Sequence, residues 1–248
     1  MHQCYNVYSR CCSIARRLIE ASKASLRAYN LIAEAIYDIS RVSEASSSMM
    51  VWNNCWSICE SLYIVNRGVN NKRLCILGPN TTYIPEDCDT YGGPEPAVWI
   101  GLEYGIKLLY ITGDLDLSTL LINEAPYVAT VLFIHIHSDN VYRLTTINKR
   151  KHLIYTSQIC TPHSTLPLGG FTDGDRAVIL GMLMNASEIL VNGYGGKEEY
   201  WYKDYKRPSW KKEKLYVTHK IIEVTAKSLN YKLEKLDNGY LLTKINNK

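Results

Sequence analysis

Short apolar runs recur from residue 71 onward, and each ends in glycine or polar residues. They include "LCIL" at 74–77, "LLYIT" at 108–112, "TVLFIHI" at 130–136 and "EILV" at 188–191. A half-exposed strand alternates apolar and polar residues, whereas a strand buried on both faces is continuously apolar. The runs therefore predict central strands of a parallel sheet, and we expect a shorter strand at 152–158.

Helix-like stretches separate these strands, and this alternation indicates the fold class. We expect helices over residues 93–106, 173–185 and 212–229, and an antiparallel hairpin over 231–245 around the turn "DNG". Alternating strands and helices predict an α/β fold, in which a mostly parallel sheet carries helices on both faces.

The first 70 residues have a different pattern. Residues 7–42 and 52–65 show apolar positions every three or four residues, which predicts helices, and the polar run "SEASSS" separates them. We therefore expect a helical N-terminal extension over residues 1–70. An α/β catalytic domain is expected over residues 71–248.

Polar segments follow the strands of the predicted sheet. They are "GPN" at 78–80, "GDLD" at 113–116, "HSDN" at 137–140, "TSQ" at 156–158 and "GGFTDGD" at 169–175, the last at the start of a helix. Ligands of open parallel sheets bind outside the carboxyl ends of the strands. We therefore expect these segments to form one site.

Five carboxylates belong to this expected site: Asp114, Asp116, Asp139, Asp173 and Asp175. Grouped carboxylates repel one another unless a cation lies among them, and hard oxygen ligands favour Mg²⁺ or Ca²⁺. A helix N-terminus beside glycine-rich backbone favours an anion. The pattern therefore predicts binding of a magnesium–nucleotide complex and phosphoryl transfer.

Simpler interpretations are open for each segment taken alone. Asp173 or Thr172 fits the N-cap of a helix, and "SDN" fits an ordinary turn. The chain contains neither a GxxxxGK[ST] phosphate loop nor a GxGxxG segment. His135 and His137 lie on one side of a strand, but as a zinc pair they would lack a nearby third ligand.

The segment "GGFTDGDRAV" at 169–178 resembles the signature of the archaeal 6-hydroxymethyl-7,8-dihydropterin pyrophosphokinases. "LGPN", "GDLD", "HIHSDN" and "TSQ" are similar to other segments of that family and occur in the same order. The resemblance covers about residues 71–225. "GDLDLS" also resembles a motif of thiamin pyrophosphokinases, which implies a Rossmann-like catalytic fold of the thiamin pyrophosphokinase type.

The resemblance implies Mg²⁺-dependent transfer of pyrophosphate from ATP to the hydroxymethyl group of a dihydropterin. AMP is released, and the product serves the synthesis of folate- or methanopterin-type cofactors. The implied catalytic carboxylates are Asp114, Asp116, Asp139, Asp173 and Asp175, of which the first three bind the metal. The implied nucleotide and phosphate contacts are Gly78, Gly169, Gly170, Thr172 and Asn140. The implied substrate contacts are Gln158, His137 and Phe171.

Several loops depart from the family's pattern. Ser138 stands where the family has glycine, "LGPN" replaces Gly-Ala-Gly-Pro-Ser, "GYGG" lacks the acid of Gly-Met-Asp-Phe-Gly, and "YGGPEPA" lacks the Asp of Ala-Asp-Gly-Ala. These differences leave the acceptor open. Three other functions are therefore retained: a thiamin pyrophosphokinase, a nucleotide-sugar transferase, and a non-catalytic nucleotide-binding module that docks a partner through its first 70 residues.

Composition argues against several other classes of protein. A hydrophobic content of 46% is enough for a large core, and a net charge of +4 does not indicate a nucleic-acid binder. The longest apolar run, 127–136, is too short to span a bilayer, and the N-terminus lacks the basic and apolar regions of a secretory signal. We expect a cytoplasmic protein that binds no membrane, and a homodimer is left open.

Two groups of residues have no settled role. The basic and aromatic segment 202–214 is either a solvated lysine-rich face or a lid in which Lys211, Lys212 and Lys214 close over phosphate. The eight cysteines lack the paired spacing of a zinc finger, so they are either buried apolar residues or disulfides.

Overall fold

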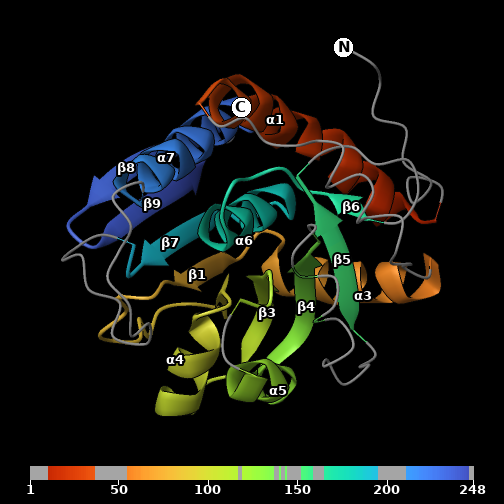
Figure 1. Cartoon of the computed structure of the whole chain (residues 1–248), viewed down its shortest axis with the longest axis vertical. Helices are drawn as coiled ribbons and strands as arrows, with labels where there is room; N and C mark the ends of the chain where they lie inside the picture. The colour runs from red at the N-terminus through yellow and green to blue at the C-terminus, as the bar shows by residue number, and fades with distance from the viewer. Residues whose placement is uncertain are drawn as a thin grey trace.

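The structure, a computed structural model, describes residues 11–36, 55–116, 119–136, 140, 143, 152–158, 165–194 and 211–245. Within these ranges the chain forms one nine-stranded sheet and six helices, and the expected α/β class is confirmed (Figure 1). None of the helices in these ranges combines the length and the apolar character needed to cross a bilayer. A cytoplasmic location and a homodimer stay predictions.

The sheet is mixed and mostly parallel. Its strand order is β6-β5-β4-β3-β2-β1-β7-β9-β8, in which all neighbours from β6 to β7 are parallel and β9 pairs antiparallel with β7 and β8. The strands are β1 Arg73–Leu77, β2 Thr90–Pro94, β3 Leu108–Gly113, β4 Ala129–His135, β5 Leu153–Ser157, β6 Leu166–Pro167, β7 Glu188–Asn192, β8 Tyr231–Leu236 and β9 Gly239–Lys244. Each strand and the hairpin expected from the sequence are therefore present.

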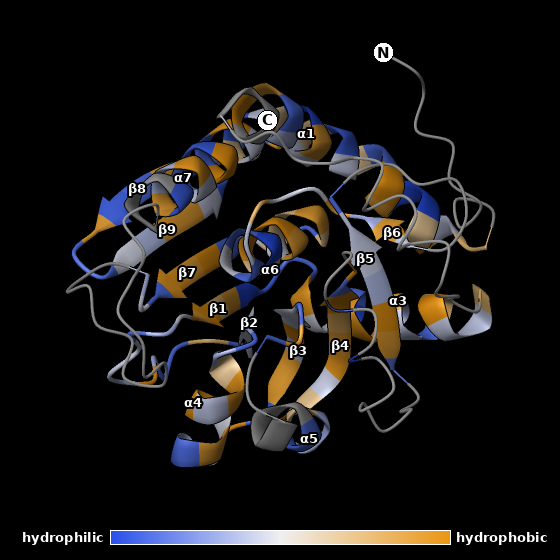
Figure 2. Ribbon diagram, in the orientation of Figure 1, coloured by the Kyte–Doolittle hydropathy of each residue, from blue (hydrophilic) through white to orange (hydrophobic). Residues whose placement is uncertain are grey.

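The helices pack against both faces of the sheet. They are α1 Ser13–Ile36, α3 Cys55–Val69, α4 Ala97–Tyr104, α5 Thr119–Val128, α6 Asp173–Leu183 and α7 Lys211–Ser228. Figure 1 shows α4 and α5 below the sheet and α1, α6 and α7 above it. Along β4, Val131 and Phe133 belong to the core cluster beneath α6, whereas Leu132 and Ile134 belong to the cluster beneath α4 and α5. Burial on both faces explains why the central strands are continuously apolar (Figure 2).

The sequence prediction was wrong at β2. Residues 93–106 were expected to be helical, but Thr90–Pro94 is a strand and the helix begins at Ala97. Glycines make this strand hard to recognise from its sequence, and close approach requires them. A Cβ on Gly92 would lie 2.9 Å from the Tyr110 ring, and one on Gly93 would lie 2.8 Å from the Leu77 carbonyl oxygen. Helix α5 and the short strand β6 were also not predicted.

The N-terminal helices precede the first strand, as expected. Two disulfides, Cys11–Cys55 and Cys12–Cys59, join the residues directly before α1 to α3, with Cα–Cα distances of 5.3 and 6.0 Å. Buried residues of α1 and α3 share one core cluster with the sheet and with α6 and α7. The domain boundary predicted at residue 70 lies in the turn between α3 and β1, and it stays a prediction.

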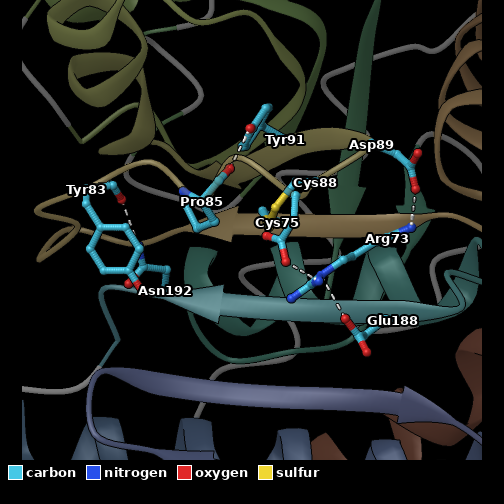
Figure 3. Close-up of a disulfide and its surroundings, with 10 residues drawn as sticks. Arg73, Cys75, Tyr83, Pro85, Cys88, Asp89, Tyr91, Glu188 and Asn192 are labelled. Atoms are coloured by element: carbon cyan, nitrogen blue, oxygen red, sulfur yellow. Dashed lines mark hydrogen bonds and ion pairs between the residues drawn. A yellow bond between two sulfur atoms is a disulfide. The ribbon is translucent and has the colours of Figure 1, made fainter.

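A third disulfide fixes the segment between β1 and β2. It joins Cys75 in β1 to Cys88, whose Cα atoms lie 5.9 Å apart (Figure 3). Beside it, Arg73 Nε forms an ion pair with Glu188 Oε1 on β7 at 2.7 Å, and the Arg73 N–H donates to Asp89 Oδ2 at 2.8 Å. The segment 78–89 between β1 and β2 is thus held at the end that enters β2.

Candidate functional site

The carboxyl ends of the parallel strands meet the first turn of α6. The Gly78 N–H after β1 donates to the Asn192 carbonyl of β7 at 2.7 Å. At the end of β3, Thr112 Oγ1 donates to the Asp173 carbonyl oxygen at 2.7 Å. Asn140 Nδ2 lies 2.7 Å from the Asp114 carbonyl oxygen, which joins the segments after β4 and β3. The predicted gathering of these segments at one edge of the sheet is confirmed for the residues described.

Four carboxylates lie together at this edge, and we call them the acidic cluster: Glu95, Asp114, Asp116 and Asp173. One oxygen each from Glu95, Asp114 and Asp116 lies within 4.8 Å of the other two, a separation that suits a shared metal ion. Asp173 adjoins them at the start of α6, where its carbonyl oxygen accepts from Thr112 at the end of β3, and burial followed by the charge of Asp114 raises the pKa of its carboxyl group. The acids come from the ends of β2 and β3 and from the start of α6.

Glu95 is the member of the cluster that the sequence prediction missed. It is 4% exposed, and its Oε2 accepts hydrogen bonds from the backbone N–H groups of Leu115 at 2.9 Å and Asp114 at 3.2 Å. Among the residues described, its buried Oε1 has no hydrogen-bond partner. Burial, followed by the charges of neighbouring acids, raises the pKa of Glu95 well above its usual value. A cation would compensate this carboxylate.

The sequence held a signal for Glu95. The segment "YGGPEPA" lacks the aspartate expected from the family, but Glu95 supplies a carboxylate two residues after Gly93. The local pattern predicts a helix here, whereas in the structure Glu95 follows the strand Thr90–Pro94 and therefore lies at the edge of the sheet that forms the site. Gly113 makes room for it, since a Cβ there would lie 2.8 Å from Glu95 Oε2.

Asp173 lies between the other three acids of the cluster and a buried arginine. Its Oδ1 is 2.6 Å from Arg176 Nη2, and Arg176 is 3% exposed. Burial and the charge of Asp114 raise the pKa of Asp173 to about 7, although Arg176 acts in the opposite direction. Asp173 therefore changes charge near neutral pH in the absence of a cation.

Asp175 lies two residues further along α6 and has a structural task. Its Oδ2 accepts from the Phe171 N–H at 2.8 Å, and its Oδ1 accepts from the Thr172 N–H at 2.7 Å. The Asp175 N–H in turn donates to Thr172 Oγ1 at 3.4 Å, which completes a capping box and confirms Thr172 as the N-cap. Both residues were also predicted to contact ligands. Their polar atoms are engaged in the cap, and the ligand contacts predicted for both residues stay predictions.

The Gly169–Gly170 loop precedes this cap and depends on its glycines. Both residues adopt left-handed backbone angles, with φ of +71° and +81°. A Cβ on Gly169 would lie 2.8 Å from the carbonyl carbon of Ser25 in α1, and one on Gly170 would lie 2.7 Å from Arg176 Cγ. The loop is therefore packed between α1 and α6. The Lys214 ammonium lies 5.6 Å from the centre of the Phe171 ring beside it.

Tyr194 connects the loop after β1 to α6. Its hydroxyl donates to the Gly174 carbonyl oxygen at 2.9 Å, and its ring packs where side chains on Gly78 or Gly174 would lie. Tyr194 belongs to "GYGG", one of the segments that depart from the family's pattern. The departure thus places an aromatic ring at the start of α6, which sequence reasoning did not foresee.

Some predicted site residues lie outside the described ranges. They are Asp139, His137 and the lid segment 202–210, together with the side chains of Lys211 and Lys212. Their roles stay predictions. Gln158 is described, and at 9% exposed it lies with Nε2 3.5 Å from the Phe171 carbonyl oxygen.

Comparison with known proteins gives three archaeal relatives, all called 6-hydroxymethyl-7,8-dihydropterin pyrophosphokinase. The Pyrococcus furiosus protein is 33% identical over 130 residues, which is 49% of this chain and 55% of that protein. The Methanocaldococcus jannaschii protein is 25% identical over 151 residues, which is 56% of this chain and 61% of that protein. The Methanothermobacter thermautotrophicus protein is 38% identical over 85 residues, which is 34% of this chain and 36% of that protein. No family model matches the chain.

The matches extend over part of each molecule, since the chain spans about half the length of the curated relatives it matches. The name shared by the three relatives is the one that "GGFTDGDRAV" suggested. The predicted resemblance is therefore confirmed: this chain is a homologue of archaeal proteins called 6-hydroxymethyl-7,8-dihydropterin pyrophosphokinase.

Proposed function

We propose that the protein is a Mg²⁺-dependent pyrophosphokinase that transfers pyrophosphate from ATP to 6-hydroxymethyl-7,8-dihydropterin. The observation that carries the proposal is the acidic cluster beside the first turn of α6. Carboxylates there suit a divalent cation, and the helix N-terminus suits phosphate. The names of the three homologues support the same chemistry. A Rossmann-like fold related to thiamin pyrophosphokinases belongs to this proposal.

The residues present fit a magnesium ion. Glu95, Asp114 and Asp116 would hold it, and the buried Glu95 Oε1, which has no hydrogen-bond partner in the described part of the chain, would gain a positive neighbour. Asp139 stays a predicted fourth contributor. When bound, Mg²⁺ would neutralise charge on the triphosphate.

The reaction joins the hydroxymethyl oxygen of the pterin to the β-phosphorus of ATP. The bond from the β-phosphorus to the oxygen that bridges it to the α-phosphorus breaks, AMP leaves with that oxygen, and the hydroxyl proton passes to solvent. Such a transfer depends mainly on aligning the two substrates. We assign the alignment of phosphate to the Gly169–Gly170 loop, Gly78 and the first turn of α6, and contact with the pterin to Phe171 and Gln158.

The test is AMP formation that depends on the acceptor. Purified protein is incubated with Mg²⁺, ATP and 6-hydroxymethyl-7,8-dihydropterin, and AMP and the pterin pyrophosphate are quantified. The matched control is 6-methyl-7,8-dihydropterin, which lacks the attacking oxygen and should give no AMP. AMP formation with thiamin instead would replace the acceptor and keep the reaction class. Absence of AMP with both acceptors would overturn the proposal.

A further inference from the structure

Helix α1 contacts the candidate site directly, although it lies far from it in the sequence. The loop that begins α6 rests on α1, because a Cβ on Gly169 would lie 2.8 Å from the Ser25 carbonyl carbon and 3.0 Å from the Leu26 nitrogen. Figure 1 shows α1 beside β6 and above α6. Two polar side chains of α1, Ser25 and Tyr29, are fully buried at this contact.

Ser25 holds the peptide group that enters the Gly169–Gly170 loop. Its Oγ lies 2.5 Å from the Leu168 carbonyl oxygen and 2.9 Å from the Ser22 carbonyl oxygen, and its one proton can serve either. The described residues contain no cis peptide bonds, so the Gly169 N–H points opposite to the Leu168 carbonyl and away from α1. Ser25 thereby orients a backbone donor of the kind that binds phosphate.

Tyr29 contacts a second site residue. Its hydroxyl donates to Gln158 Oε1 at 3.2 Å, and the Gln158 Nε2 donates to the Phe171 carbonyl oxygen at 3.5 Å. The Phe171 carbonyl oxygen can only accept, so the donor end of the Gln158 amide faces it, and the acceptor end faces α1, where the Tyr29 hydroxyl donates to it. The amide donor of Gln158 is thereby directed toward the loop before α6.

Helix α1 is itself firmly placed. The cystines Cys11–Cys55 and Cys12–Cys59 join its N-terminal end to α3, and apolar residues along it, such as Leu18 and Ile19, lie in the core cluster that contains α6 and α7. A rigid element makes a precise support for binding groups, because small displacements of aligned groups lower rates strongly.

We propose that Ser25 and Tyr29 are positioning residues, through which α1 sets the conformation of the Gly169–Gly170 loop and the orientation of the Gln158 amide. The N-terminal extension is then part of the site. The effect on rate rests on the proposed function, whereas the effect on the loop does not.

The first experiment compares Ser25→Ala with Ser22→Ala. Ser22 is the matched control, because it is equally buried one turn earlier and its Oγ donates to Ile19 O of its own helix at 2.8 Å. Amide hydrogen exchange is followed over residues 165–172. We expect faster exchange there in S25A and no change in S22A. Equal exchange in the two variants would overturn the role of Ser25, whether or not the protein forms AMP.

The second experiment is a double-mutant cycle on kcat/KM for the acceptor. Tyr29→Phe removes only the hydroxyl, and we expect it to lower kcat/KM by about 10-fold, in line with the sensitivity of aligned groups to displacement. In a Gln158→Ala background the same change should have no further effect, because Tyr29 acts through Gln158. A full 10-fold loss in both backgrounds would show a general packing role and overturn the proposal for Tyr29.

The two experiments separate the two hypotheses. If wild-type protein forms no AMP with any acceptor, the proposed function fails, and exchange at residues 165–172 still decides whether α1 controls the loop. If wild-type protein is active and neither readout responds to S25A or Y29F, the proposed function stands and the positioning role fails.

Discussion

The carboxylates at the edge of the sheet lie in two different surroundings, the acidic cluster and the cap of α6. In the acidic cluster, Glu95 keeps a buried oxygen with no hydrogen-bond partner among the described residues, and its neighbours carry the same charge. In the cap of α6, Asp175 has both oxygens bonded to backbone N–H groups. Asp173 and Asp175 are two residues apart on one helix, yet they belong to different groups.

This difference in hydrogen bonding distinguishes acids that stabilise the fold from acids that are available to a ligand. A buried carboxylate whose oxygens are bonded stabilises the fold, whereas grouped carboxylates without compensation destabilise it until a cation arrives. Local departures from good packing and pairing are expected at functional sites. The comparison therefore predicts opposite results when acids of the two groups are replaced.

The largest effect is expected for Asp116→Asn. The change removes one charge at the exposed rim of the acidic cluster and keeps the side-chain volume. We expect AMP formation to fall by about 100-fold or more, the size of other losses of charge stabilisation in active sites. The melting temperature should stay the same or rise. Initial rates and calorimetry measure both, and turnover at the wild-type rate would remove Asp116 from the metal site.

Asp175→Ala should lower the stability of the protein, whereas Asp116→Asn should lower its activity. It leaves the buried N–H groups of Phe171 and Thr172 without their acceptor and takes a counter-charge from Arg176. We expect the free energy of unfolding to fall by about 3 kcal/mol, as when a buried charged partner is lost. Denaturant titration measures this change.

Thr172→Ala is the companion variant for the cap. It removes the N-cap hydroxyl and should cost about 1 kcal/mol. Mg²⁺ affinity should change little in either variant while the protein is folded. An Asp175→Ala protein with wild-type stability and lost Mg²⁺ affinity would place Asp175 in the acidic cluster instead.

Glu95→Gln tests whether the cluster is poised for a cation. The amide keeps the shape and removes a buried charge, so we expect the metal-free protein to gain about 1 kcal/mol of stability above neutral pH. Mg²⁺ affinity should fall by about 10-fold or more. Glu103→Gln on the exposed side of α4 is the matched control and should change neither quantity. Unaltered Mg²⁺ affinity in E95Q would contradict the assignment.

The last test is the pH dependence of the metal-free protein, which needs no substitution. The pKa of Asp173 is raised to about 7 in the folded state, so the folded protein binds this proton more tightly than the unfolded chain. The resulting stability is present below about pH 4 and is lost as the pH rises toward 7, by at most about 1.4 kcal/mol per pH unit. Melting curves in EDTA measure it, and saturating Mg²⁺ should flatten the dependence. Asp116→Asn should flatten it partly.

The sequence predicted those parts of the fold in which local pattern and burial agree. The runs at 130–136 and 188–191 became strands because both of their faces are covered. The strand Thr90–Pro94 was missed because its glycines are required by neighbours, Tyr110 and the end of β1, that only the folded structure brings close. Tertiary contacts override local propensity there.

The site was predicted in outline for the same reason. Asp114 and Asp116 follow an obvious strand, so their place at the edge of the sheet could be foreseen. Glu95 depended on the missed strand. The separate tasks of Asp173 and Asp175 depended on which backbone N–H groups turn toward each carboxylate, which residue spacing does not contain.

The two disulfides between the start of α1 and α3 lie side by side and connect the same two segments. Their contributions to stability therefore largely overlap. Cys11–Cys55 spans 44 residues and Cys12–Cys59 spans 47, so each closes nearly the same loop. In the chain-entropy account, either bond alone restricts the unfolded chain by about 4 kcal/mol, and the second disulfide adds only a very small ring. Reduction of one disulfide would thus leave α1 tied to α3, and the loss of both would remove this covalent constraint while the packing of α1 in the core remains.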